Sequence, residues 1–159
     1  MAQSFLKPVY GVIQNITPMQ DQCCSSLVSL FTSDGIVRFI VGPDTFVIDN
    51  VRLFPGMPVT AFYDPDSPVT LIFPPQYQAL IIGRRQQNES AAAGYFDENL
   101  TAADQSLQLN IGTNTTISTA NGQPYRCSPA GQYLAVFYSA TTRSIPPQTT
   151  PRRIIVFCQ

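Results

Sequence analysis

The chain has 159 residues, a length that allows one domain or two small ones. Charged residues make up 12% of the sequence, about half of the roughly 25% found in typical globular proteins, and the formal net charge is −1. This balance argues against a broad nucleic-acid-binding surface, and a weakly charged surface does little to oppose self-association.

Short runs rich in β-branched and aromatic residues alternate with turn signals, which predicts β-strands throughout. In the first half of the chain the expected strands are Val9–Ile13, Ser26–Thr32, Ile36–Val41, Thr45–Asp49, Pro58–Tyr63 and Gln76–Gly83. In the second half they begin near Gly94 and include Leu107–Ile111, Asn114–Ala120, Gln132–Tyr138 and Arg152–Phe157. No segment has a clear apolar period of about 3.6 residues, so no long helix is expected.

The two halves of the chain resemble each other. Val59–Tyr63 and Leu134–Tyr138 both end in Phe-Tyr, each run has a Gly three residues before it, and each is followed by Pro-Pro-Gln. Such self-similarity indicates a duplicated structural unit. We therefore expect an N-terminal arm over residues 1–8, a first repeat over 9–83, a linker over 84–93 and a second repeat over 94–159.

Further matches between the repeats follow from their apolar patterns. Leu107–Ile111 matches Leu27–Phe31, and Asn114–Ala120 occupies the place of the third strand. At the end of each repeat, Ala79–Ile82 matches Ile154–Phe157. Five or six short strands in roughly 75 residues suit a small closed β-barrel such as the OB-fold, with a two-sheet sandwich as the rival. The predicted class is therefore all-β, with two tandem OB-like barrels.

A sequence motif supports this interpretation. The stretch from Val59 to Tyr77, with its Phe-Tyr strand and Pro-Pro-Gln-Tyr segment, resembles a motif of uncharacterised proteins from anaerobic Firmicutes. The resemblance covers most of residues 9–83 and extends more weakly over 94–158, where Thr149 replaces the Tyr. It implies tandem OB-type barrels, and it carries over no catalytic or binding residue.

The chain contains four cysteines and no histidine; the cysteines are Cys23, Cys24, Cys127 and Cys158. Without His, and with two adjacent cysteines, a tetrahedral zinc site is disfavoured, so we expect no metal and no cofactor. Neighbouring cysteines rarely bond to each other. Either all four are reduced, half-buried thiols of a cytosolic protein, or Cys23, Cys24 and Cys158 form disulfides with another subunit. The pair Cys23–Cys24 is expected in a polar loop after the first strand.

Other polar groups have structural interpretations. Arg84–Arg85 and Arg152–Arg153 flank the last strand of each repeat and could contact phosphates beside stacked tyrosines, as OB-folds do. These tyrosines are Tyr63, Tyr77, Tyr95, Tyr133 and Tyr138. The charge balance instead favours solvated strand ends and core aromatics. The acid pairs Asp64/Asp66 and Asp97/Glu98 are interpreted as turn residues, and no catalytic motif is present, so no enzyme activity is expected.

These features predict a structural protein that assembles with copies of itself, for example as a filament or appendage subunit. Its N-terminal segment Ala2–Pro8 could pair with the sheet edge of a neighbouring copy. The alternative is a non-catalytic binding module for a peptide, a glycan or single-stranded nucleic acid. The start of the chain has no apolar signal region and no run is long enough to span a membrane, so we expect a cytoplasmic protein or export by a non-classical route.

Overall fold

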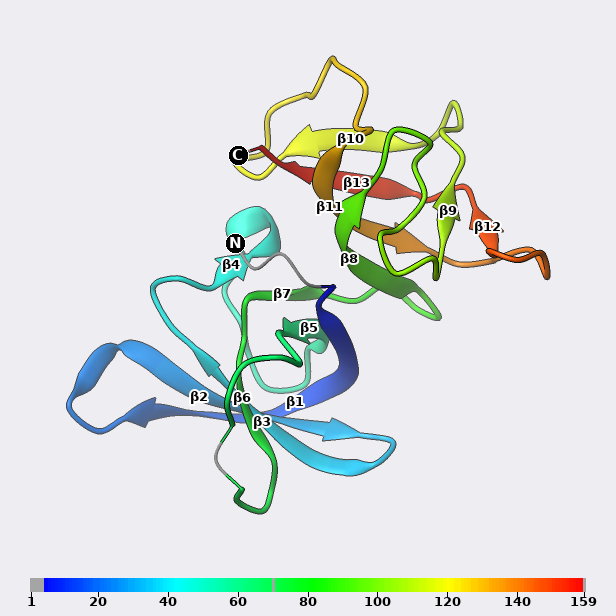
Figure 1. Cartoon of the computed structure of the whole chain (residues 1–159). Helices are drawn as coiled ribbons and strands as arrows, with labels where there is room; N and C mark the ends of the chain where they lie inside the picture. Colours follow the sequence, from blue (N-terminus) through cyan, green and yellow to red (C-terminus); the bar gives the residue numbers. More distant parts are fainter. Residues whose placement is uncertain (1–4, 70, 159) are drawn as a thin grey trace. The chain divides into compact units, whose positions relative to one another are not determined.

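The computed structural model describes residues 5–69 and 71–158, and over these residues it consists of β-strands, loops and one short 3-10 helix (Figure 1). The predicted all-β class is confirmed. The chain forms two compact units. Residues 7–86 form the N unit, and residues 87–158 together with Phe5 and Leu6 form the C unit. The chain therefore passes from one unit to the other at Leu6–Lys7 and again at Gln86–Gln87.

The N unit contains one seven-stranded sheet with the strand order β4-β7-β5-β1-β2-β3-β6. Its strands are β1 (Lys7–Met19), β2 (Gln22–Thr32), β3 (Gly35–Val41), β4 (Phe46–Val47), β5 (Pro58–Tyr63), β6 (Gln76–Gln78) and β7 (Ile81–Arg84), with the 3-10 helix η1 at Ile48–Asn50. The β1–β2 hairpin is much longer than predicted. The strand expected at Thr45–Asp49 is shortened because Asp49 turns the chain with a φ of 61°.

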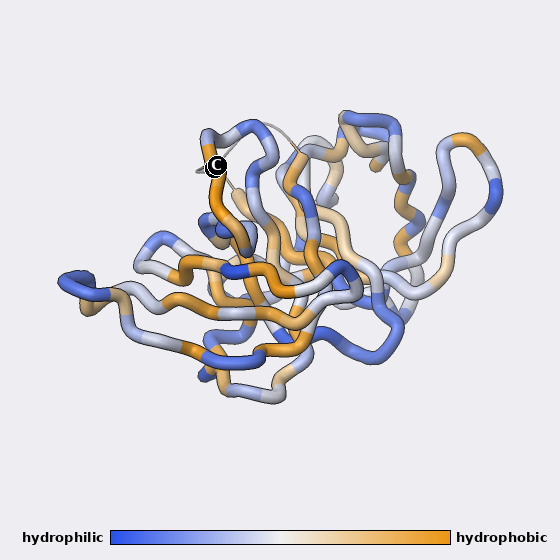
Figure 2. Tube along the Cα trace, turned by 90° about the horizontal axis from the view of Figure 1, so that it is seen from below, coloured by the Kyte–Doolittle hydropathy of each residue, from blue (hydrophilic) through white to orange (hydrophobic). Residues whose placement is uncertain are grey.

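The C unit contains a four-stranded sheet with the order β10-β13-β11-β8 and a two-stranded sheet of β12 and β9. Its strands are β8 (Ser90–Phe96), β9 (Gln108–Leu109), β10 (Thr116–Thr119), β11 (Gln132–Tyr138), β12 (Gln148–Thr149) and β13 (Arg153–Phe157). Figure 2 shows apolar segments running through the strands of the chain, with hydrophilic residues at most of the turns. This is the arrangement expected for sheets with a buried face.

The two units share one pairing pattern. Strands β4-β7-β5-β1 correspond to β10-β13-β11-β8, and in both sets the first pair is parallel and the other two pairs are antiparallel. The parallel pair β3–β6 likewise corresponds to the parallel pair β9–β12. The C unit has only isolated bridges where the N unit has the long β2. The pattern supports the duplication inferred from the sequence.

The pairing also corrects three of the sequence matches. Leu107–Ile111 contains β9, which corresponds to β3 and not to β2, and Asn114–Ala120 contains β10, which corresponds to β4. The match of the last strands is shifted, because Ile81 pairs with Phe62 while Arg153 pairs with Phe137. Apolar alternation repeats in every strand, so it fixes the face of a strand and not its place in the sheet order.

Both units bury the apolar residues that the sequence marks as core. In the N unit, one cluster contains Val28, Leu30, Phe39, Val59 and Ile82, and in the C unit another contains Phe96, Leu109, Leu134, Val136 and Ile154. The apolar patterns of the two Phe-Tyr strands and of the last strand of each repeat predict burial of six residues, and all six are buried: Val59, Phe62, Ile81, Val136, Phe137 and Ile155. No sheet of the described residues closes on itself, so the expected closed barrels are not confirmed.

An aromatic group at the margin of the N-unit core gives a pH-dependent prediction. The rings of Tyr63 and Tyr77 stack with centroids 3.9 Å apart. Burial, then a hydrogen bond with Tyr77 and its charge, raise the pKa of Tyr63 above the usual 10.0. Because the folded state holds this proton to a higher pH, Tyr63 contributes stability below pH 10.0, and the contribution is lost as the pH rises through the raised pKa.

We expect the free energy of unfolding to fall less steeply above pH 10.0 in Tyr63→Phe than in the unmodified protein. Denaturant titrations at a series of pH values on either side of pH 10.0 measure this slope. Tyr95→Phe, which removes a phenol hydroxyl from an exposed side chain, is the matched control. Identical slopes for Tyr63→Phe and the unmodified protein would show that Tyr63 titrates alike in both states.

Candidate functional site

The adjacent thiols lie in a strand and not in the loop that the sequence suggested. Cys23 and Cys24 belong to β2, directly after the hairpin turn at Gln20–Asp21. The register jumps from Met19↔Gln22 to Pro18↔Ser26, so the residues in between bulge out of the ladder. Both cysteines are exposed. A bulge bends its strand and redirects side chains, which here keeps two neighbouring thiols accessible at one end of the hairpin.

The other two thiols belong to the C unit. Cys127 is in the loop between β10 and β11, Cys158 follows β13, and both are exposed. Partial burial raises the pKa of Tyr125, and the nearby charges of Cys127 and Cys158 raise it further. None of the four cysteines in the described residues is bonded to another.

Several of these arginines and tyrosines contact other side chains of their own unit. The guanidinium of Arg84 lies 5.6 Å from the ring centroid of Phe54, and that of Arg85 lies 4.4 Å from the centroid of Tyr10. These contacts anchor the side chains within the N unit. In the C unit, Tyr133 is buried and meets Phe157 edge to face. This arrangement agrees with the structural interpretation of these residues.

The acid pairs lie in turns. The Asp64 carboxylate accepts a hydrogen bond from the backbone N–H of Asp66 at 2.9 Å. The Asp97 carboxylate accepts from the N–H groups of Asn99 and Thr101 at 2.8 and 3.1 Å. Over the described part of the chain, no group of three or more Cys, Asp or Glu side chains is placed to hold a metal ion. The same residues include no helix of the length and apolarity needed to cross a membrane.

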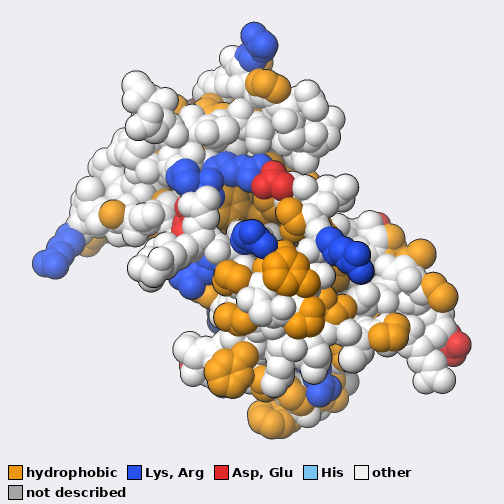
Figure 3. All heavy atoms as spheres, turned by 180° about the vertical axis from the view of Figure 1, so that it is seen from behind, with side chains coloured by type: hydrophobic (Ala, Val, Ile, Leu, Met, Phe, Trp, Pro, Cys, Tyr) orange, Lys and Arg blue, Asp and Glu red, His pale blue; other side chains and the backbone are white. Residues whose placement is uncertain are grey.

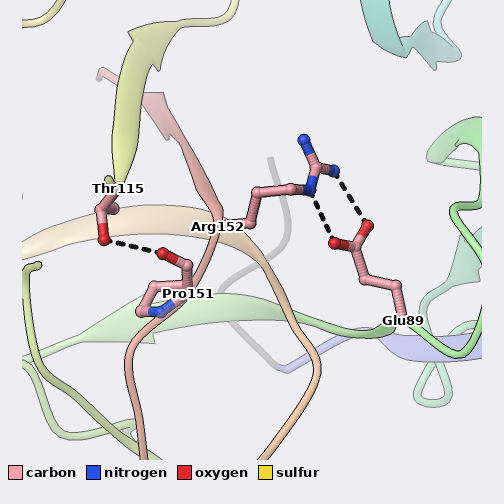
Figure 4. Close-up of polar contacts among 4 residues, drawn as sticks. All are labelled: Glu89, Thr115, Pro151 and Arg152. Carbon is pink, nitrogen blue, oxygen red and sulfur yellow. Dashed lines mark hydrogen bonds and ion pairs between the residues drawn. The ribbon is translucent and has the colours of Figure 1, made fainter. Parts of the chain in front are cut away.

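A polar cleft of about 560 Å³ opens in the C unit. It is lined mostly by hydroxyl and amide side chains; they are Asn110, Asn114, Thr115, Ser139, Thr141, Thr142, Gln148, Thr149 and Thr150. Several of these hydroxyls are engaged in fixing the loops. The Thr115 Oγ1 donates to the Pro151 carbonyl at 2.7 Å (Figure 4), and the Thr149 Oγ1 donates to the Ala140 carbonyl at 2.6 Å. The sequence did not indicate this cleft, because its residues come from four separate segments.

One ion pair lies at the margin of this cleft. Arg152 lines the cleft and donates from Nε and Nη2 to the two oxygens of Glu89, at 2.7 and 2.9 Å (Figure 4). The Glu89 side chain is only 5% exposed, whereas that of Arg152 is 43% exposed. A bidentate guanidinium–carboxylate pair is the strong form of this interaction. It ties the start of β8 to the start of β13.

Large hydrophobic side chains are exposed mainly on the N unit. Of the ten such residues, seven lie between Lys7 and Gln86: Val12, Phe31, Phe54, Val69, Leu71, Ile72 and Phe73. The last four belong to the loop between β5 and β6. Figure 3 shows hydrophobic side chains at the surface, together with several Lys and Arg side chains on the face in view. Four of these side chains are therefore concentrated in one loop of the N unit.

The N-terminal segment is bound to the C unit. Leu6 is buried and its N–H donates to the Ala93 carbonyl at 2.9 Å, which adds a short antiparallel bridge beside β8. The Phe5 ring lies 5.7 Å from that of Phe96. In the sequence, the apolar pair Phe5-Leu6 between Ser4 and Lys7 is a signal for this contact. No family model matches the chain, and neither curated proteins nor solved structures gave a match.

Proposed function

We propose that this protein is a structural subunit that assembles with copies of itself, for example into a filament or appendage. Its two β units are repeats of one OB-like plan, and disulfides from Cys23, Cys24 and Cys158 link neighbouring subunits. The observation that carries the proposal is the exposure of Cys23 and Cys24 side by side on the β2 bulge.

Two adjacent cysteines need partners elsewhere in the assembly. A disulfide between sequence neighbours is strained, so each thiol is better satisfied by a thiol further away. A neighbouring copy supplies Cys158, which lies one residue before the end of the sequence and is exposed. Each bond removes two electrons and two protons from a thiol pair, and molecular oxygen or a small-molecule disulfide accepts them. Such bonds persist where thiols are not kept reduced.

The surface composition supports close packing of many copies. Few charges oppose contact, and apolar side chains are exposed on the N unit. A contact between two different surfaces of the molecule repeats without closing, unless its rotation happens to form a ring. A head-to-tail contact of this kind produces an open fibre. No catalytic turnover is part of this proposal.

The covalent part of the proposal is tested by exchanging cysteines for serine. After oxidation with oxidised glutathione, we expect disulfide-linked multimers on non-reducing gels, and these should disappear in Cys23→Ser/Cys24→Ser. Cys127→Ser is the matched control, because it removes an equally exposed thiol and should leave the multimers in place. Multimers that persist without Cys23 and Cys24, or a protein that stays monomeric after oxidation, would refute these cross-links.

The cleft in the C unit favours a second candidate function. Its volume of about 560 Å³ and its hydroxyl and amide lining suit a polar ligand such as a glycan. The protein would then be a non-catalytic binding module, which is the alternative that the sequence analysis names. The two candidates differ in mass, because a binding module stays at 17.5 kDa, or forms a small oligomer, whatever its concentration.

A further inference from the structure

The N-terminal segment contacts β8 through one backbone bridge and one packed aromatic ring. Leu6 is 3% exposed and forms the backbone bridge to Ala93. Phe5 lies against β8 at Gly94 and packs on the buried Phe96. We call Phe5–Leu6 the arm and Ala93–Phe96 the socket. Without the arm, β8 would be an open sheet edge.

Gly94 leaves the room that the Phe5 ring occupies. A Cβ at this position would lie 1.9 Å from Cδ1 and 2.0 Å from Cε1 of Phe5, so any side chain here would collide with the ring. Glycine in the interior of a strand weakens the strand, and it is typical where another group approaches the backbone closely. The sequence therefore contains a residue whose structural use is to admit the arm.

The chain connectivity separates the arm from its socket. The residue after the arm, Lys7, already belongs to β1 of the N unit, and the chain returns to the C unit only at Gln86–Gln87. Along the chain, the arm is therefore separated from the socket by the whole N unit and by the short segment 85–89 between β7 and β8. The contacts are chemically the same if the arm comes from another copy, which is the condition for domain swapping.

We propose that, in the assembly, the socket on β8 binds the Phe5–Leu6 arm of a second copy of this chain. This inference rests on the proposed function and names the contact that propagates the assembly. Each copy donates one arm and accepts one arm through different surfaces, so the contact adds subunits head to tail. Backbone pairing supplies the alignment, and the ring over Gly94 supplies the selectivity, as in other cases of strand addition.

The test divides the arm and the socket between two chains, both with the four native cysteines replaced by serine. The donor carries Leu6→Cys and Gly94→Leu, which blocks its own socket. The acceptor carries Ala93→Cys and lacks residues 2–6. After mixing with oxidised glutathione, the two thiols form one disulfide and two glutathione molecules are released. We expect a heterodimer of twice 17.5 kDa as the main cross-linked species.

Two controls make the result specific. Adding Phe5→Asp to the donor should reduce the heterodimer at least about tenfold, because a carboxylate cannot occupy the apolar socket. If the acceptor does not fold, a full-length chain with Leu6→Cys and Ala93→Cys in the same serine background gives the answer. A ladder of linked chains supports exchange of the arm, and an internal bond alone overturns it.

The outcomes separate this inference from the proposed function. If the unmodified protein forms multimers but donor and acceptor give no heterodimer, the exchange of the arm is wrong and self-assembly stands on other contacts. If the unmodified protein never forms multimers, the proposed function fails, even where a heterodimer shows that the socket accepts an arm from another chain.

Discussion

Phe62→Ala should lower the free energy of unfolding by about 3–5 kcal/mol, the cost of opening a large cavity in a packed core. Phe62 is 0% exposed and pairs with Ile81 on β7 and Pro8 on β1. A small unit has a thin core and little capacity to collapse around the missing ring. Chemical denaturation followed by circular dichroism measures the change.

The chain offers a matched control for this substitution. Phe31 on β2 is 62% exposed, so Phe31→Ala removes the same atoms from a site in contact with water. We expect Phe31→Ala to change the stability by less than about 1 kcal/mol. Similar losses for the two variants would mean that Phe62 does not contribute as a core residue and that the sheet packing described here is wrong.

Arg152→Ala should cost about 2–3 kcal/mol, because it leaves the buried Glu89 carboxylate short of two charge-assisted hydrogen bonds. The cost is smaller than for a fully buried pair, since the Arg152 side chain is 43% exposed. Arg143→Ala, on an exposed loop of the same unit, should have an effect within about 0.5 kcal/mol. Thermal and denaturant unfolding of the three proteins measure the difference.

A double variant distinguishes the loss of the Glu89–Arg152 ion pair from the cost of leaving Glu89 buried without its partner. In Glu89→Leu/Arg152→Leu no buried charge remains, so most of the stability lost in Arg152→Ala should return. Equal stability of Arg152→Ala and Arg143→Ala would contradict the structural role of the ion pair. A double variant no more stable than Arg152→Ala would show that the packing around Glu89, and not its charge, is what the first substitution disturbed.

The sequence predicted the all-β class and the buried core residues, because these depend on local patterns. Alternating apolar residues mark the buried face of a strand, which is why the burial of Phe62 and Phe137 could be stated beforehand. The order of the strands in each sheet could not be predicted from the sequence. The short β9 and β10 have patterns similar to those of other strands, and only their parallel pairing with β12 and β13 shows which strands of the N unit they match.

The sequence singled out the cysteines of the candidate site, but it did not predict which structural elements hold them. Cys23 and Cys24 were expected in a polar loop, because the polar residues Gln20–Gln22 precede them, whereas the hairpin extends the strand through them and leaves both exposed. The cleft and the Glu89–Arg152 pair join segments far apart in the sequence, so no local pattern signals them. The segment Ala2–Pro8 was expected to pair with the sheet edge of a neighbouring copy. In the structure Leu6 bridges to Ala93 of its own chain, Ala2–Ser4 lie outside the described residues, and the fit of Phe5 against Gly94 has no signal in the sequence.

The most direct test of self-assembly is light scattering of the unmodified protein over a range of concentrations, with and without reductant, followed by negative-stain microscopy of the same samples. The proposal predicts particles much larger than 17.5 kDa that grow with concentration, persist in part when disulfides are reduced, and appear as regular multimers or fibres. A constant mass of 17.5 kDa at every concentration, oxidised or reduced, would contradict it and favour the binding-module alternative.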